Sequence, residues 1–462
     1  MLRKTPKVLA WIVGGLIGLS VALYLVIVAI NWRDAEPSAD VLRMSVSYRD
    51  RPTIRDEDNA LVFAMGFAVA PGESPLEMGS KRVAWLRQQE RPAGFDSSTD
   101  PLGVPSNLRA AMHPALRAYF GACTPGTTGC AAAFAEASRT FDDWKVSEDW
   151  LLERYRTLVG LPGWREEIPI DIAAPLPAFQ VVFDGQELLM LHARNRAARG
   201  DAAGVKELLE GDLRFWRRVL ASSDLFITKV IAAAALKRHF KLGADALRQL
   251  PPERAMEAAP SEWRAPFTET ELSPRRWMIG EWIYSSHVFS NDGPELVDAL
   301  APDDSIVSKL LTRLGRPAFQ LQDTINRSAD YFSRAIDLVE GVPLAEYEAA
   351  ANRVTELSTR ASHESWPPRS LYNIAGRILV GHGADYGSYV RRVGDIEGVR
   401  RAALAAIELH AAQIDTADAP AALAASELRN PYTDEPFEWD AAEAAVVFRG
   451  LEPGDRGVHR ID

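Results

Sequence analysis

Three consecutive segments decide the fold: ELLMLHARNRAARG (residues 187–200), DAAGVKELLEGDLRFWRRVLASS (201–223) and DLFITKVIAAAALKRHFKLG (224–243). Apolar residues recur in each at helical spacing. Gly200 is suited to end the first helix and Asp201 to cap the second. Helices of about twenty residues joined by such minimal turns are antiparallel neighbours. The stretch therefore predicts a mainly α protein built from TPR-like or α-solenoid-like hairpins, although no clean period of about 34 residues recurs.

The same periodicity predicts a helical ectodomain over residues 59–425. SEDWLLERYRTLVG (147–160) has a cap at Ser147 and a terminating Gly160, and further helices are expected at 271–288, 304–314, 318–340, 343–360, 369–380 and 393–413. Short strands are expected at LVFAMGFAVA (61–70) and IPIDIA (168–173). Residues 426–462 change character, because turn residues precede a β-prone AVVF run at 445–448, and they predict a small C-terminal β-hairpin.

Two motifs carry a resemblance. NPYTDEPFEWD (430–440) with its following VVF, and FWRRVLASSDLFITK (215–229), resemble segments of a loose set of bacterial proteins. That set has one N-terminal membrane helix and no assigned activity, and the likeness covers about half of the chain in scattered pieces. The resemblance implies the architecture and brings no catalytic residue with it.

The N-terminal segment predicts a membrane anchor. Residues 8–30 contain no charge, and 23 residues at about 1.5 Å each suffice to cross a hydrocarbon core of roughly 30 Å. The apolar run exceeds that of a cleaved signal peptide, and no clear small-x-small cleavage site follows it. Residues 1–7 would then form a cytoplasmic tail, and residues 31–58, rich in charge and with two prolines, a stalk or linker.

Flanking charge predicts the orientation. Arg3, Lys4 and Lys7 precede the span without an acidic residue, whereas basic and acidic residues are mixed after it. The positive-inside rule places the N-terminus in the cytoplasm and the bulk of the chain in the periplasm, attached to the inner membrane. Gly14 and Gly18 form a GxxxG pattern, which either marks the face of a helix homodimer or reflects the small residues common in any membrane helix.

The two cysteines are Cys123 and Cys130, in GACTPGTTGC (121–130). Zinc needs about four ligands, and the nearest histidine is His113. The spacing is not that of a C-x-x-C redox pair. A local disulfide is favoured over two free thiols, because the anchor independently indicates an exported compartment.

Composition excludes some classes of function. The net charge is −11 and the pI is near 5.4, with basic and acidic residues interleaved, which argues against a nucleic-acid partner. The eight histidines include no HExxH pattern, and there is no GxSxG, Walker or GxGxxG motif. We expect no metal site and no cofactor. His192, Arg194 and Asn195 are interpreted as partly solvated helix residues.

Glu281 is the candidate catalytic residue. It interrupts the apolar run RRWMIGEWIYSSHVF (275–289), and on a helix Ser285 lies one turn later, with His287 nearby. A carboxyl group in an apolar pocket has the raised pKa that a general acid needs. The alternative is a structural glutamate paired with Arg275 or Arg276.

Two functions follow as hypotheses. The first is a membrane-anchored periplasmic scaffold or inhibitor-type module that binds an unidentified envelope protein, which makes a non-enzymatic role the favoured one. The second is an envelope hydrolase of the peptidoglycan type that uses a buried carboxylate such as Glu281.

Overall fold

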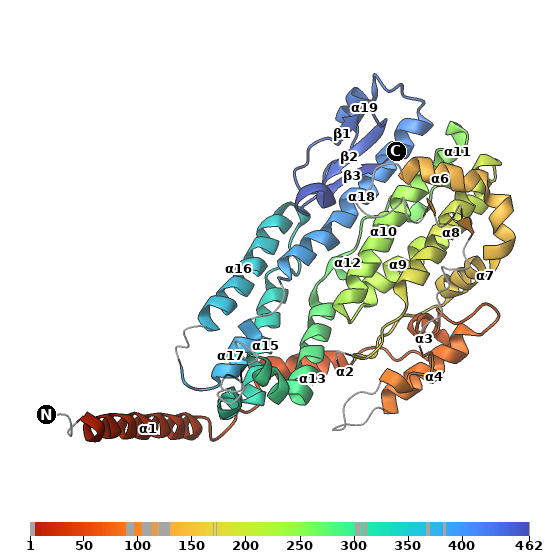
Figure 1. Ribbon diagram of the computed structural model, residues 1–462. Helices are drawn as coiled ribbons and strands as arrows, with labels where there is room; N and C mark the ends of the chain where they lie inside the picture. Colours follow the sequence, from red (N-terminus) through yellow and green to blue (C-terminus); the bar gives the residue numbers. More distant parts are fainter. Residues whose placement is uncertain are drawn as a thin grey trace. The chain divides into compact units, whose positions relative to one another are not determined.

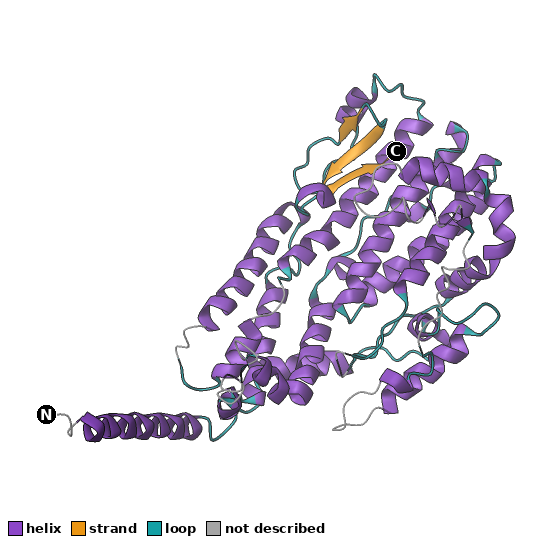
Figure 2. Cartoon of the chain, viewed as in Figure 1, coloured by secondary structure: helices purple, strands orange, loops and turns teal. Residues whose placement is uncertain are grey.

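The fold is seen in a computed structural model that describes residues 5–88, 97–103, 113–114, 116, 118–119, 130–169, 171, 173–300, 305, 308, 312–365, 370–381 and 385–461. These residues are mainly helical, with one small antiparallel sheet near the C-terminus (Figure 2). The prediction of a mainly α fold is confirmed. The C-terminal hairpin is also present, extended by a third strand.

The chain divides into two compact units. Unit 1 contains Met1–Arg51, Trp282–Ala335 and Val354–Asp385, and unit 2 contains Pro52–Glu281, Ile336–Arg353 and Tyr386–Asp462. Both units are assembled from segments far apart in sequence, so the chain enters and leaves each of them more than once.

Unit 1 is built on the N-terminal helix and four further helical elements. Its elements are α1 (Thr5–Ile30), α2 (Ala39–Arg49), η5 (Arg316–Ala318), most of α15 (Leu321–Asp337) and α17 (Ile374–Gly381). Two more helices, α13 (Arg275–Ala299) and α16 (Tyr347–Ser365), contribute residues to both units. The helix expected at 271–288 is thus real but begins and ends later.

Unit 2 holds the remaining elements. They are η1 (Asp56–Asp58), α3 (Ala60–Met65), α4 (Pro75–Gln88), η2 (Ser97–Thr99), α6 (Cys130–Arg139), α7 (Phe141–Gly160), α8 (Phe179–Ala198), α9 (Ala202–Ser222), α10 (Phe226–Leu247), α11 (Pro252–Ala258), η4 (Ser261–Trp263), α12 (Glu269–Leu272), η6 (Leu344–Glu346), α18 (Gly387–Ala411), α19 (Ala419–Ala425), β1 (Glu438–Asp440), β2 (Ala445–Arg449), η7 (Gly454–Gly457) and β3 (Val458–Ile461).

The three segments that predicted helical hairpins form α8, α9 and α10, which pack side by side (Figure 1). Gly200 ends the first helix with a φ of 77°, in the left-handed region that glycine enters without steric cost. Asp201 caps the next helix by accepting a hydrogen bond from the Gly204 N–H at 3.0 Å. Both predicted cap positions are confirmed.

A fully buried polar network joins α7, α8, α9 and α10. Asp212 accepts hydrogen bonds from the Tyr155 hydroxyl, from Gln186 Nε2 at 3.1 Å and from His239 Nδ1 at 2.8 Å. The indole N–H of Trp263 can only donate, and it donates to His239 Nε2 at 3.0 Å. His239 Nε2 therefore accepts and its Nδ1 donates, and the side chain of Asp212 joins α9 to α7, α8 and α10.

The C-terminal sheet has the strand order β1-β2-β3, with both pairs antiparallel. Its central strand β2 contains the predicted AVVF run and is buried along four of its five residues. The sheet packs against α18 and α10. A Cβ at Gly398 of α18 would lie 2.0 Å from the Phe448 ring, so glycine is needed for the strand to reach the helix.

The strand expected at 61–70 is wrong. Residues 60–65 form the short helix α3, all of whose side chains are buried. α3 pairs closely with α4, because a Cβ at Gly66 would lie 2.0 Å from the Pro75 carbonyl oxygen and one at Gly79 would lie 1.7 Å from that of Val62. An unbroken apolar run of this length is compatible with a buried strand or a buried helix, and here helix packing decided the outcome.

Candidate functional site

The end of α1 is joined to unit 1 by a buried asparagine. Asn31 Nδ2 donates to the Leu371 carbonyl at 2.9 Å, and its Oδ1 accepts from the Asn373 N–H at 2.8 Å. Its backbone carbonyl accepts from Gln320 Nε2 at 2.9 Å. These contacts cross about 290 to 340 residues of sequence, so the first residue after the apolar helix belongs to a folded core.

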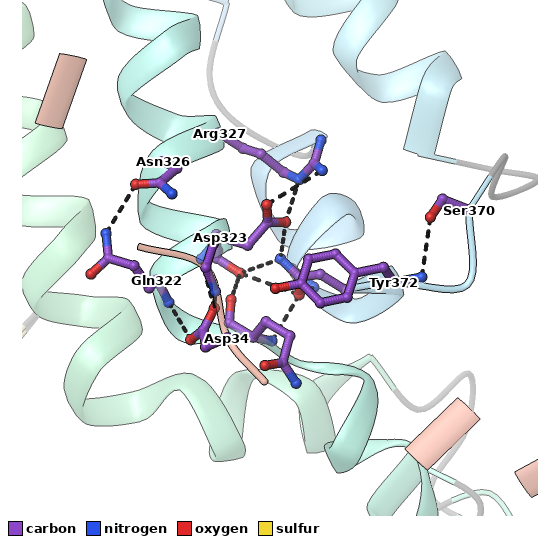
Figure 3. Close-up of polar contacts among 12 residues, drawn as sticks. Asp34, Gln322, Asp323, Asn326, Arg327, Ser370 and Tyr372 are labelled. Carbon is purple, nitrogen blue, oxygen red and sulfur yellow. Dashed lines mark hydrogen bonds and ion pairs between the residues drawn. The ribbon is translucent and has the colours of Figure 1, made fainter. Parts of the chain in front are cut away.

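Asp34 caps a helix that lies far away in sequence (Figure 3). Its two carboxylate oxygens accept from the backbone N–H groups of Gln322 at 2.7 Å and Asp323 at 3.0 Å, in the first turn of α15. A carboxylate at a helix N-terminus satisfies unpaired donors and interacts favourably with the helix dipole. Tyr372 reinforces the joint by donating from its hydroxyl to the Arg33 carbonyl at 3.3 Å.

Asn373 lies at the centre of the same network. Its φ of 49° is in the left-handed region, which asparagine tolerates better than most residues. Its Oδ1 accepts from the N–H groups of Gln320 at 2.9 Å and Gly376 at 3.2 Å. Its Nδ2 donates to Asp323 at 2.8 Å and Thr324 at 3.0 Å. One side chain thus connects the start of α15 to the start of α17.

Within residues 31–58, which were predicted to form a stalk or linker, residues 31–49 form contacts and a helix in unit 1, and Asp56–Asp58 form η1 in unit 2. The Ser38 N–H donates to Asn326 Oδ1 at 2.9 Å, and Asn326 Nδ2 donates to the Glu36 carbonyl at 2.8 Å. α2 follows, and its Arg43 donates a hydrogen bond to the Ser333 hydroxyl of α15 at 2.6 Å. We call the contacts of residues 31–38 with residues 320–326 and 371–376 the anchor joint.

The two glycines of the GxxxG pattern lie on α1. Within the described residues, α1 is the helix that is long and apolar enough to cross a membrane, over Trp11–Ile30, and none of that stretch is buried in the protein. A Cβ built at Gly14 or Gly18 meets no atom within 4 Å. The face that these glycines define is therefore open.

Glu281 lies on α13 in unit 2 and contacts the start of α10. One carboxylate oxygen accepts from the Phe226 N–H at 3.2 Å, and the other is 3.4 Å from the Tyr386 hydroxyl, which donates to it. The side chain is partly buried. Burial raises its pKa from the ordinary 4.5 to about 7. The expected raised pKa is thus present, and its cause is loss of solvent.

The alternative pairing of Glu281 with a neighbouring arginine is wrong. Arg275 forms its ion pair with Glu340, and Arg276 bonds Asp224 at 2.8 Å. Glu281 instead accepts a hydrogen bond from the Phe226 backbone N–H, in the way that Asp34 accepts from backbone N–H groups in unit 1.

A second glutamate caps the same end of α10. Glu166 is fully buried, and one of its oxygens accepts from the N–H groups of Asp224 at 2.6 Å and Leu225 at 2.7 Å. Its other oxygen accepts from the Thr228 hydroxyl. Burial, and then the charge of Asp224, raise the pKa of Glu166 to about 7. Glu166 and Glu281 together cap three consecutive N–H groups; we call them the capping glutamates.

Aromatic rings pack beside Glu281. The ring of Phe226 lies 4.2 Å from that of Tyr389, 5.6 Å from that of Trp277 and 5.8 Å from that of Tyr386, measured between centroids. These contacts are edge-to-face or tilted, as aromatic pairs prefer. Two members of this cluster bond the Glu281 carboxylate, Phe226 through its N–H and Tyr386 through its hydroxyl.

A buried lysine lies one turn into α10. Lys229 Nζ donates to the carbonyls of Leu220 at 2.8 Å and Glu271 at 2.6 Å, at the ends of α9 and α12. Burial lowers the pKa of this amine to about 7. Lys229 and Glu166 were both missed by the sequence reasoning. Their only local signal is a charged residue beside apolar neighbours, which many exposed positions share.

The remaining predicted positions show no arrangement that points to a functional site among the described residues. Cys123 lies outside the described residues, and Cys130 begins α6, so the disulfide stays a prediction. His192, Arg194 and Asn195 are partly exposed on α8, as interpreted, and Arg194 pairs with Asp245 at 2.8 Å. Across the described part of the chain, no three His, Cys, Asp or Glu side chains are grouped so as to hold a metal ion.

Comparison of the chain with protein-family models, with curated proteins and with solved structures finds no match. The resemblance to anchored bacterial proteins therefore stays a prediction, and function has to be argued from the anchor joint and the capping glutamates.

Proposed function

We propose that this chain is a single-pass inner-membrane protein whose helical body acts in the periplasm as a scaffold or inhibitor-type module for an envelope protein. Its hairpins would stack in the manner of an α-solenoid and present a surface to that partner. The observation that carries this proposal is the anchor joint. Asn31 and Asp34 connect an exposed apolar helix directly to the folded body, which is the design expected of a module held at a membrane.

The use of the buried charges supports a binding role over catalysis. Asp212 and Glu166 accept hydrogen bonds from the core, and the Arg400–Glu397 pair, at 2.6 Å, is fully enclosed. Charged groups that bond buried backbone and side-chain partners stabilise a fold. They are poorly placed to meet a substrate.

Topology is tested by fusing alkaline phosphatase or green fluorescent protein to the C-terminus in a Gram-negative host. Phosphatase activity with a dark fluorescent fusion supports a periplasmic body, because phosphatase needs an oxidising compartment to fold. The reverse pattern contradicts it.

Photocrosslinking in intact cells, with the anchor present, tests whether one envelope protein is captured in stoichiometric amount. Loss of that partner when residues 1–30 are replaced by another membrane helix would assign the contact to the anchor instead of the body.

A homodimer through α1 is part of the same proposal. Gly14 and Gly18 lie one turn apart on an open face, which permits close approach of a second helix. We expect Gly14→Leu with Gly18→Leu to reduce the dimer fraction of the full chain in nanodiscs. Ser20→Leu, on the far side of the helix, is the matched control. Equal dimer fractions in all three proteins would contradict a glycine interface.

The second candidate is an envelope hydrolase that uses Glu281 as a general acid. Its partial exposure and pKa of about 7 favour this role. A glycan hydrolase also needs a second carboxylate, and Glu166, which bonds the N–H groups next to the one that Glu281 bonds, is fully buried. The test is digestion of purified peptidoglycan by the full chain and by Glu281→Gln. Activity that the variant loses while its unfolding curve is retained would favour the enzyme.

A further inference from the structure

Three exposed apolar side chains surround the point where α1 enters unit 1. Trp32 directly follows Asn31 and is 78% exposed, Leu314 is 48% exposed and Leu371 is 39% exposed. Removing such side chains from water is favourable by roughly 25 cal/mol per Å² of apolar surface. Because all three are exposed near the same point, we expect another apolar surface to cover them.

The anchor joint brings these residues close to the C-terminal end of α1. The carbonyl of Leu371 accepts from Asn31 Nδ2 at 2.9 Å. Leu314 lies two residues before η5, and η5 packs against α1. Segments separated by about 280 to 340 residues in sequence thus form a collar around the end of the anchor helix.

The collar also carries positive charge. Arg33 is exposed, and Arg313 and Arg316 share the carboxylate of Asp298 at 3.5 and 2.7 Å. Asp298 and Glu295 offset part of this charge, because both carboxylates act on Arg316. Guanidinium groups bind phosphate oxygens in two-pronged hydrogen bonds.

We propose that this collar of Trp32, Leu314 and Leu371, with Arg33, Arg313 and Arg316, rests on the surface of the phospholipid bilayer. The proposal depends on the proposed function in one respect, that α1 spans the membrane. Trp11–Ile30 covers about 30 Å as a helix, so Ile30 lies at one boundary of the hydrocarbon core and the collar at the headgroups.

Each part of the collar suits that layer. Tryptophan is favoured at the boundary between lipid and water, leucine buries its side chain among the outer acyl carbons, and arginine meets the phosphates. A bilayer is preferred over a protein partner because the collar is continuous with the helix that enters the membrane. The joint then fixes unit 1 against the membrane surface.

The test places one environment-sensitive fluorescent amino acid in the full chain, which leaves both cysteines intact. The positions are Leu314 and Leu371 in the collar, Leu19 in the middle of α1, and Val46 as the matched control. Val46 is also apolar and exposed, at 46%, but it lies on α2 three residues after Arg43, which bonds Ser333 in the second half of α15, whereas the joint involves the start of α15. Each protein is placed in nanodiscs of phosphatidylethanolamine and phosphatidylglycerol. Emission wavelength, quenching by headgroup-nitroxide lipids and quenching by aqueous iodide are recorded.

We expect probes at Leu314 and Leu371 to emit at shorter wavelength than the probe at Val46 and to be quenched by the nitroxide lipids. The Leu19 probe should be shielded from iodide. If Leu19 is shielded while Leu314 and Leu371 respond as Val46 does, the collar proposal is overturned and the anchor stands. Lipid quenching at Val46 equal to that in the collar also overturns it, because the contact is then not confined to this face. Quenching of the Leu19 probe by iodide would contradict the proposal that α1 spans the membrane, and the proposed contact of the collar with the bilayer would fail with it.

Discussion

Replacing Glu166 by glutamine should stabilise the protein, and more so at high pH. The amide keeps an oxygen for the N–H groups of Asp224 and Leu225, and the Thr228 hydroxyl can rotate to accept from the new NH₂ group. Glu166 has its pKa raised from 4.5 to about 7 in the folded state. Between these two pH values the folded protein binds a proton that the unfolded chain has lost, so stability falls as pH rises. From pH 5 to pH 8 this linkage amounts to about 2.5 kcal/mol.

The assay is urea unfolding of the full chain in detergent micelles, followed by circular dichroism at pH 5, 6, 7 and 8. The free energy of unfolding of Glu166→Gln should exceed that of the unsubstituted chain by about 1 kcal/mol at pH 5 and about 3 kcal/mol at pH 8. Glu271→Gln is the control. Glu271 is buried and bonded to Arg217, and its pKa is lowered, so it is ionised in both states over this range. Its loss should destabilise the protein by an amount that does not change with pH.

One result would refute the reasoning about the capping glutamates. If the difference between Glu166→Gln and the unsubstituted chain is the same at pH 5 and pH 8, the carboxyl group of Glu166 titrates in its ordinary range. Destabilisation at pH 8 would go further, because it would mean that the ionised cap contributes more to α10 than its burial costs.

Two further predictions concern packing and a buried acceptor. Gly280→Ala should destabilise unit 2 by about 3 kcal/mol or more, because its Cβ would lie 1.6 Å from the Asp224 carbonyl oxygen. The control is Gly211→Ala in α9, which should be neutral or slightly stabilising because a Cβ there meets nothing within 4 Å. Equal melting temperatures for the two variants would contradict this prediction. Tyr432→Phe should lower the free energy of unfolding by about 2 kcal/mol, since the hydroxyl donates to the buried Asp395 carboxylate at 2.9 Å; an unchanged urea midpoint would show that this bond contributes nothing.

Local signals predicted the helical hairpins well. The caps at Gly200 and Asp201 depend on residues within a few positions, so sequence was sufficient for them. The same holds for the strand that contains the AVVF run. α7 shows the limit of such signals, because it begins at Phe141 and leaves the expected cap, Ser147, inside the helix. The fully apolar run at 60–65 has no periodicity to read, and the close approach of two helices at Gly66 decided its structure.

The candidate site was only partly predictable. An acidic residue inside an apolar run was enough to single out Glu281 and its raised pKa. Its partner was not predictable, because the arginines nearest in sequence bond other carboxylates and Glu281 bonds the Phe226 N–H, 55 residues away. Glu166 reaches the same helix end from a segment with no helical or strand pattern of its own.

By itself the sequence determined the apolar N-terminal helix, the mainly helical body and the positions of several caps, because each depends on residues within one or two turns of each other. Only the tertiary structure decided that residues 31–38, which follow this helix, bond residues 320–326 and 371–376. Asn31 and Asn373 are separated by 342 residues, and the sequence around either residue does not indicate that the other is its partner. Buried polar groups must find partners wherever the fold brings donors and acceptors together, and that requirement is what connects α1 to the rest of unit 1.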